Sequence, residues 1–173
     1  MTDRIYMGVK SNHKSSNKAV MIFPEKKNLG ICNIGHQVIY KLINSHEEFY
    51  CDRMYLTKAC VSEEQGWSIS KFDYIFVSLS FDTNLINYIN LMEYLEIPLF
   101  SEHRNSDIAS SYPLIICGGM FATYNPEIIA DYFDAIVMGE GENVISDILD
   151  ILCDNKNKAQ HQNVGLKIKC EIA

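Results

Sequence analysis

The chain has 173 residues, of which 47% are hydrophobic, and this length and composition predict a single domain with one apolar core. Its formal net charge of -7 disfavours a nucleic-acid backbone or an anionic membrane surface as the main partner, because either would repel the molecule. The cysteines are widely spaced with no C-x-x-C pair, the N-terminus is polar, and no segment approaches the roughly 20 apolar residues of a membrane span. These features predict a cytoplasmic protein with reduced thiols.

The first half of the chain alternates between predicted strands and helices. Residues 1–18 are rich in serine, asparagine and lysine and indicate a flexible leader. Residues 19–23 form an apolar run that ends at a proline, which is typical of a buried strand. Asn33 is the predicted N-cap of a helix whose apolar residues, beginning with Ile34, recur at helical spacing and face one side. Residues 50–56 are the second predicted strand.

The second half continues the alternation. Three further apolar runs are predicted strands: residues 74–77, 114–117 and 135–138. Helices are predicted to open at Asp82 or Thr83, and at Glu142. Asn125 is a predicted cap followed by Pro126 at the first helical position, which is the preferred order for a helix start.

Five apolar strands separated by amphipathic helices predict a parallel sheet that is covered on both faces. With right-handed crossovers, the fold class is α/β, as a three-layer flavodoxin-like (Rossmann-like) sandwich over residues 19–153. Residues 154–173 are interpreted as a linker. Within them, residues 164–172 alternate between apolar and polar types, which indicates a strand that pairs with the sheet edge or begins a further domain.

Small residues follow the predicted strands and mark a binding rim. Gly118-Gly119 stops the fourth strand, and Gly139 with Gly141 stops the fifth, so a ligand can approach the backbone closely there. Neither G-x-G-x-x-G nor G-x-x-x-x-G-K-S/T is present, which disfavours nucleotide phosphate as the ligand. Serine and glycine at strand ends are also ordinary turn residues in any such fold.

Several short sequence motifs follow one another in a specific order along residues 19–152. They are Phe23-Pro24 with Asn33-Ile34-Gly35, Phe76-Val77-Ser78-Leu79-Ser80, Ile97-Pro98-Leu99, Cys117-Gly118-Gly119, Asn125-Pro126-Glu127, Ala130-Asp131 and Gly139-Glu140-Gly141-Glu142. Together they resemble the N-terminal cobalamin-binding domain of radical S-adenosylmethionine proteins, in the subgroup whose first loop lacks D-x-H-x-x-G.

The resemblance implies that cobalamin lies across the carboxyl ends of the strands, held by backbone groups and small hydroxyls. It also implies that the nucleotide tail runs down near residues 30–35 and Ser78. The cofactor-binding residues that follow from it are Asn33, Gly35, Ser78, Leu79, Ser80, Gly118, Gly119, Met120, Gly139, Glu140 and Gly141.

Two motifs of the wider family are absent from these 173 residues. Without D-x-H-x-x-G, His36 is interpreted as a solvated or helix-packed residue. The lower face of a bound cobalamin is then expected either to have no protein ligand or to keep its own base. The other histidines are predicted to lie on the surface: His13, His46, His103 and His161. Without C-x-x-x-C-x-x-C, the iron-sulfur cluster and S-adenosylmethionine belong to a catalytic domain or subunit outside this chain.

The sequence therefore predicts a cobalamin-binding module that is not catalytic alone and that works with a radical S-adenosylmethionine domain or subunit. Neither nucleic acid nor a membrane is an expected partner. Two alternatives remain open: a ligand-free flavodoxin-like interaction domain, and a stand-alone corrinoid carrier.

Overall fold

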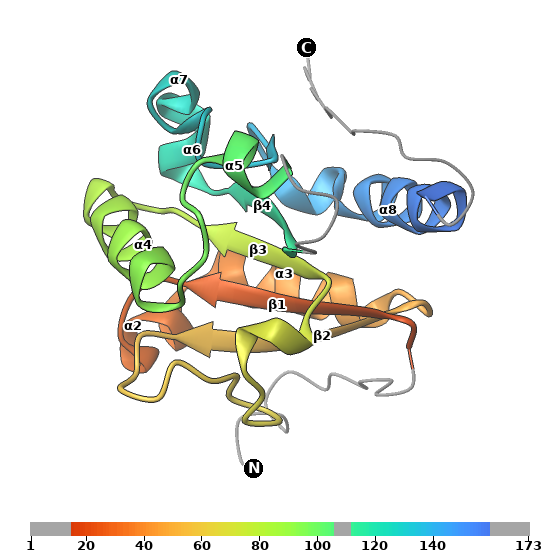
Figure 1. Cartoon of the computed structure of the whole chain (residues 1–173), viewed down its shortest axis with the longest axis horizontal. Coiled ribbons are helices and arrows are strands. Elements are labelled where there is room, and N and C mark those ends of the chain that lie inside the picture. The colour runs from red at the N-terminus through yellow and green to blue at the C-terminus, as the bar shows by residue number, and fades with distance from the viewer. Residues whose placement is uncertain (1–14, 106–111, 160–173) are drawn as a thin grey trace.

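The computed structural model describes residues 15–105 and 112–159 (Figure 1). The strands are β1 (Asn17–Phe23), β2 (Phe49–Tyr55), β3 (Tyr74–Ser78), β4 (Leu114–Gly118) and β5 (Ala135–Ile136). The α-helices are α2 (Lys27–Cys32), α3 (Ile34–Ser45), α4 (Asp82–Tyr94), α5 (Ser101–Asn105), α6 (Met120–Tyr124), α7 (Pro126–Ile129) and α8 (Ile145–Ala159), with short 3-10 turns η1 (Ile69–Lys71) and η2 (Gly141–Asn143).

All strand pairs are parallel, and the strand order is β2-β1-β3-β4-β5. This arrangement confirms the predicted flavodoxin-like sandwich. From β1 the chain first adds β2 on one side and then crosses back to add β3 on the other side of β1. The strand order therefore reverses between β1 and β3. Ligands of such sheets bind in the crevice at this switch point, beyond the carboxyl ends of the strands.

Each strand sends alternate side chains to opposite faces, and the two faces have separate cores. Met21 and Phe76 pack with residues of α3 and α8, whereas Val20 and Ile75 pack with residues of α4. Both faces of the central strands are therefore buried, which explains why their sequences are continuously apolar. Figure 1 shows the helices arranged around the sheet in this way.

The predicted boundaries differ from the structure at several points. Lys18, placed in the leader, belongs to β1, where its amide donates to Asp73 Oδ2 at 2.9 Å. The fifth strand has only two residues, and the last helix begins at Ile145 after the turn η2. Helix α8 continues to Ala159, so the first part of the predicted linker is helical. The rest of the leader and the predicted strand 164–172 lie outside the described residues.

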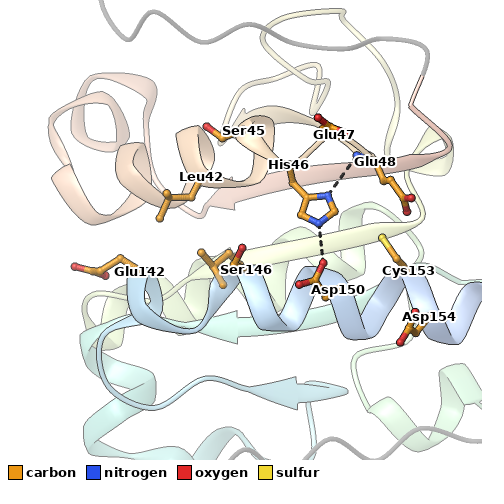
Figure 2. Close-up of a pocket in the computed structure, with 11 residues that line it drawn as sticks. Leu42, Ser45, His46, Glu47, Glu48, Glu142, Ser146, Asp150, Cys153 and Asp154 are labelled. Carbon is orange, nitrogen blue, oxygen red and sulfur yellow. Dashed lines mark hydrogen bonds and ion pairs between the residues drawn. The ribbon is translucent and has the colours of Figure 1, made fainter.

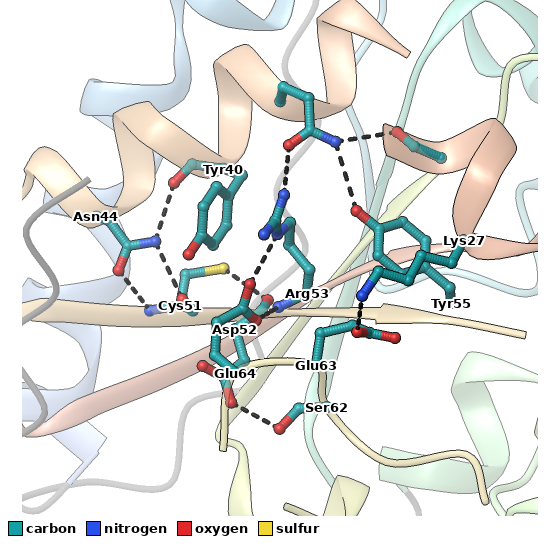
Figure 3. Close-up of polar contacts among 12 residues, drawn as sticks. Lys27, Tyr40, Asn44, Cys51, Asp52, Arg53, Tyr55, Ser62, Glu63 and Glu64 are labelled. Atoms are coloured by element: carbon teal, nitrogen blue, oxygen red, sulfur yellow. Dashed lines mark hydrogen bonds and ion pairs between the residues drawn. The ribbon is translucent and has the colours of Figure 1, made fainter. Parts of the chain in front are cut away.

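Polar side chains occupy the outer edge of β2 (Figure 3). The amide and carbonyl of Cys51 both bond to the Asn44 side chain, at 3.1 and 3.0 Å. The amide of Arg53 donates to Glu64 Oε2 at 2.7 Å, and its carbonyl accepts from the Glu63 amide at 2.8 Å. Arg53 and Glu64 also form a buried ion pair at 2.8 Å between Nε and Oε1. The segment after β2 is thus fixed against the border of the sheet.

Within the described part of the chain, no helix combines the length and the apolar character needed to cross a membrane.

Candidate functional site

A cavity of about 430 Å³ lies at the carboxyl ends of the strands, between the sheet, the start of α3 and the start of α8. Ten of the eleven residues predicted for the cofactor site line it: Asn33, Gly35, Ser78, Ser80, Gly118, Gly119, Met120, Gly139, Glu140 and Gly141. Five chain segments that are distant in sequence meet here because the parallel strands all end at the same edge of the sheet.

The deep wall of the cavity is apolar. Met21, Phe76 and Ile116 form one row across β1, β3 and β4, since each is the register partner of the next. Ile39 from α3 and Ile148 from α8 face the same space. The next row toward the rim on this face holds Ser78, whose register partner is Gly118, so small residues stand where the cavity opens.

Hydrogen bonds hold the polar rim in place. Asn33 caps α3, because its Oδ1 accepts from the His36 amide at 2.9 Å, while its Nδ2 donates to Ser80 Oγ at 3.1 Å. This side chain therefore joins the first loop to the end of β3, and it confirms the predicted N-cap.

On the other side of the mouth, Thr123 Oγ1 donates to the Gly119 carbonyl at 3.0 Å and accepts from the Gly139 amide at 3.0 Å. The loops after β4 and β5 are thereby linked. Sequence reasoning missed Thr123, because its role depends on two loops that meet only in the fold.

Leu79, the eleventh predicted residue, does not line the cavity. Its side chain is fully buried in the opposite core, on the α4 side. Its amide donates to the Gly118 carbonyl at 2.9 Å, and its carbonyl accepts from the Phe121 amide at 3.0 Å. Leu79 therefore positions the rim through its backbone.

The two adjacent glycines after β4 have different roles. Gly119 has φ = +106°, and a Cβ there would lie 2.5 Å from the Leu79 carbonyl oxygen, so the fold itself requires glycine. A Cβ on Gly118 would make only ordinary contact, 3.8 Å from Val137 Cβ. Gly118 therefore leaves its backbone accessible from the cavity, whereas Gly119 allows its own chain segment to lie close to the segment of Leu79.

Large apolar side chains are exposed on the segments around the mouth. Ile34, at the start of α3, is 78% exposed, although the sequence pattern placed it on the inner stripe of that helix. Lys41, seven residues further on, points in the same direction as Ile34 and is also exposed, whereas the buried face of α3 contains Tyr40 and Ile43. Phe81 after β3, with Met120 and Tyr124 on α6, is also largely exposed.

His36 is fully buried and packs between the rings of Phe23 and Tyr55, with centroids 5.5 and 5.6 Å away. Neither ring nitrogen has a hydrogen-bond partner among the described residues. Burial, followed by the charge of Arg53, lowers the pKa of the ring from 6.5 to about 3, so it is neutral at ordinary pH. His36 lies in the first turn of α3, on the buried face of that helix, and it is not among the residues that line the cavity.

A second cavity, of about 740 Å³, follows the seam between α3 and α8 (Figure 2). His46, predicted as a surface residue, is partly buried here and its Nε2 lies 3.1 Å from Asp150 Oδ1. Burial, followed by Glu48, raises the pKa of the neighbouring Cys153 thiol to about 12, which favours the protonated thiol. His103 is exposed as predicted. His13 and His161 lie outside the described residues.

Among residues 15–105 and 112–159, no group of three or more histidine, cysteine, aspartate or glutamate side chains is arranged to hold a metal ion. The candidate site is thus an apolar cavity with a polar rim.

The chain is thus an α/β module with a doubly wound parallel sheet and a cavity at its switch point, the place where such folds bind their ligands. The model of the family described as radical SAM proteins, N-terminal, matches residues 35–172 of the chain. This match covers most of the sequence, and the chain therefore belongs to the N-terminal region family of radical SAM proteins. Neither the curated proteins nor the solved structures include one that matches the chain.

Proposed function

We propose that the chain is the cobalamin-binding module of a radical S-adenosylmethionine enzyme. The observation that carries the proposal is the cavity at the switch point, which combines an apolar interior with a rim of small residues. Family membership supports the enzyme context, and the shape and chemistry of the cavity support a broad, mostly uncharged ligand.

The cavity suits part of a corrinoid. A volume of about 430 Å³ with walls such as Phe76 and Ile116 can enclose a flat aromatic group. The wider corrin ring lies above it in this proposal, over Ser78 and Gly118. The exposed side chains of Ile34 and Phe81 supply further apolar surface around the mouth.

The donor set fits a corrinoid whose cobalt has no protein ligand. The cavity-lining residues include no histidine. Cys117 borders the cavity, but its side chain packs in the core on the α4 side, where burial raises the pKa of the thiol and keeps it protonated. When bound, cobalamin supplies a metal centre for methyl-group or radical chemistry. The chain's own residues bind and orient it: the hydroxyls and amides of the rim hold the polar arms, and the apolar wall excludes water.

The chemistry also requires a partner. The sequence contains no C-x-x-x-C-x-x-C, so the iron-sulfur cluster and S-adenosylmethionine are supplied by a catalytic domain or subunit. In this proposal the module, predicted as residues 19–153, extends from the start of β1 to the end of α8, residues 17–159, and the protein works in the cytoplasm.

Reconstitution tests the proposal. The chain is mixed with hydroxocobalamin and passed through a gel-filtration column, and the visible spectrum of the protein peak is recorded. We expect retained colour in the parent and in Ser70→Leu, an exposed position on η1 before β3. Gly118→Leu should lose the colour, because the new side chain enters the mouth of the cavity.

The two leucine variants are matched in the residue that they introduce, and thermal unfolding verifies that both are folded. An uncoloured parent would overturn the proposal and favour the ligand-free interaction domain. A coloured Gly118→Leu variant would refute the placement of the site. If the chain retains colour but a separate binding experiment finds no catalytic domain or subunit that associates with it, the stand-alone carrier is favoured.

A further inference from the structure

The floor of the cavity is one row of three side chains on the central strands. Met21, Phe76 and Ile116 are register partners, and each is at least 96% buried. Phe76 and Ile116 precede Ser78 and Gly118 by two residues, so the floor lies roughly 7 Å below the rim. Ile39 and Ile148 close the space from the helices.

Hydrogen-bonding groups are concentrated at the rim. The Asn33 side chain is bonded to Ser80 and to the His36 amide, and the Thr123 hydroxyl is bonded to two glycines. The strands beneath are paired in register, which occupies their amides and carbonyls. Among the described residues, the floor therefore presents only hydrocarbon and thioether groups.

A ligand atom that needs a hydrogen bond is at a disadvantage on such a floor, because it leaves water without gaining a partner. A base that carries only methyl groups on its buried edge has no such cost. The bases of natural corrinoids differ in this respect: a dimethylbenzimidazole presents methyl groups, whereas adenine presents an amino group and additional ring nitrogens.

We propose that this cavity selects corrinoids by the base at the end of their nucleotide arm, and that it favours a benzimidazole over a purine. The inference rests on the proposed function and adds the class of ligand to it. The row Met21, Phe76 and Ile116 is the selecting element.

Equilibrium dialysis of the parent chain against three probes tests the inference: cobalamin, the corrinoid with adenine as its base, and cobinamide, which has no base. We expect cobalamin to bind on the order of tenfold to a hundredfold more tightly than the adenine form, as for one or two unpaired buried groups. Cobinamide should also bind more weakly than cobalamin, because the floor is left unfilled.

The outcomes separate the inference from the proposed function. Equal binding of cobalamin and the adenine form, or of cobalamin and cobinamide, overturns the selection while leaving cobalamin binding intact. Binding of none of the three overturns the proposed function and the selection together.

A matched pair of variants adds an independent measurement. Met21→Gln places an amide on the floor with nearly the same side-chain length, so it should bring the affinities for the adenine form and cobalamin closer together. Ile86→Gln introduces the same residue at an exposed position on α4, outside the cavity, and should leave the ratio of affinities as in the parent. Equal ratios in the two folded variants would refute the role of the floor. If Met21→Gln does not fold, the comparison of probes on the parent still decides the question.

Discussion

Replacing His36 by leucine tests the neutral, buried imidazole on α3. The ring is packed between Phe23 and Tyr55, and its pKa is about 3 in the folded chain. In the unfolded chain the pKa is near 6.5. Because the folded-state value is the lower one, the unfolded state takes up the proton first. The stability associated with the neutral ring is complete above pH 6.5 and is lost as the pH falls toward 3.

The size of the effect follows from the two pKa values. At pH 5, about 1.5 units below the unfolded-state pKa, the ring is protonated in the unfolded chain and almost entirely neutral in the folded chain. The free energy of unfolding is therefore lower by about 2 kcal/mol. Arg53, Tyr55 and Glu64 belong to the same electrostatic neighbourhood, and burial raises the pKa of the Glu64 carboxyl. These groups are present in parent and variant, so the difference between the two isolates His36.

Urea unfolding at pH 7.5 and pH 5.0 measures the effect. The parent should lose about 2 kcal/mol more than His36→Leu over this interval. His103→Leu, the same change at an exposed histidine, should retain the dependence of the parent. Parallel curves for the parent and His36→Leu would show that the imidazole is accessible to protons in the folded chain.

Three further changes address the edge and the rim. Glu64→Gln leaves the buried Arg53 without its counter-charge and should lower the free energy of unfolding in urea by about 3 kcal/mol, whereas an unchanged midpoint would mean that the pair is solvated. Gly119→Ala should destabilise the chain by about 1–3 kcal/mol, because φ is +106° and the new Cβ would meet the backbone of Leu79. Gly118→Ala should cost much less, and equal losses of stability in thermal unfolding would contradict this distinction. Asn33→Ala should lower stability by about 1 kcal/mol through loss of the N-cap, and no change in the urea midpoint would exclude that role.

The sequence predicts the sheet and the location of the rim because both depend on local signals. The apolar run that stops at Gly118 marks the end of β4, although β5 already ends at Ile136, before Gly139. Parallel strands bring their ends to one edge. The same signals cannot tell that Gly119, unlike Gly118, is required by the fold, since the 2.5 Å approach at Gly119 comes from a segment 40 residues earlier, at Leu79. The cofactor assignments themselves remain predictions.

The other differences have a similar origin. The apolar pattern placed Ile34 on the buried side of its helix, but the buried face of α3 is formed by residues such as Tyr40 and Ile43, and Ile34 points away from it. Polar surroundings in sequence placed His46 on the surface, yet α8 passes beside it and Asp150 contacts its ring. Contacts between elements that are remote in sequence decide both cases.

The occupied border of β2 limits how the sheet can grow. At Cys51 and Arg53 the outward amides and carbonyls are already used by Asn44, Glu63 and Glu64. An incoming strand would have to displace these side chains, so an intermolecular ribbon is discouraged on that side. Lateral extension of the sheet by another copy is therefore directed toward β5.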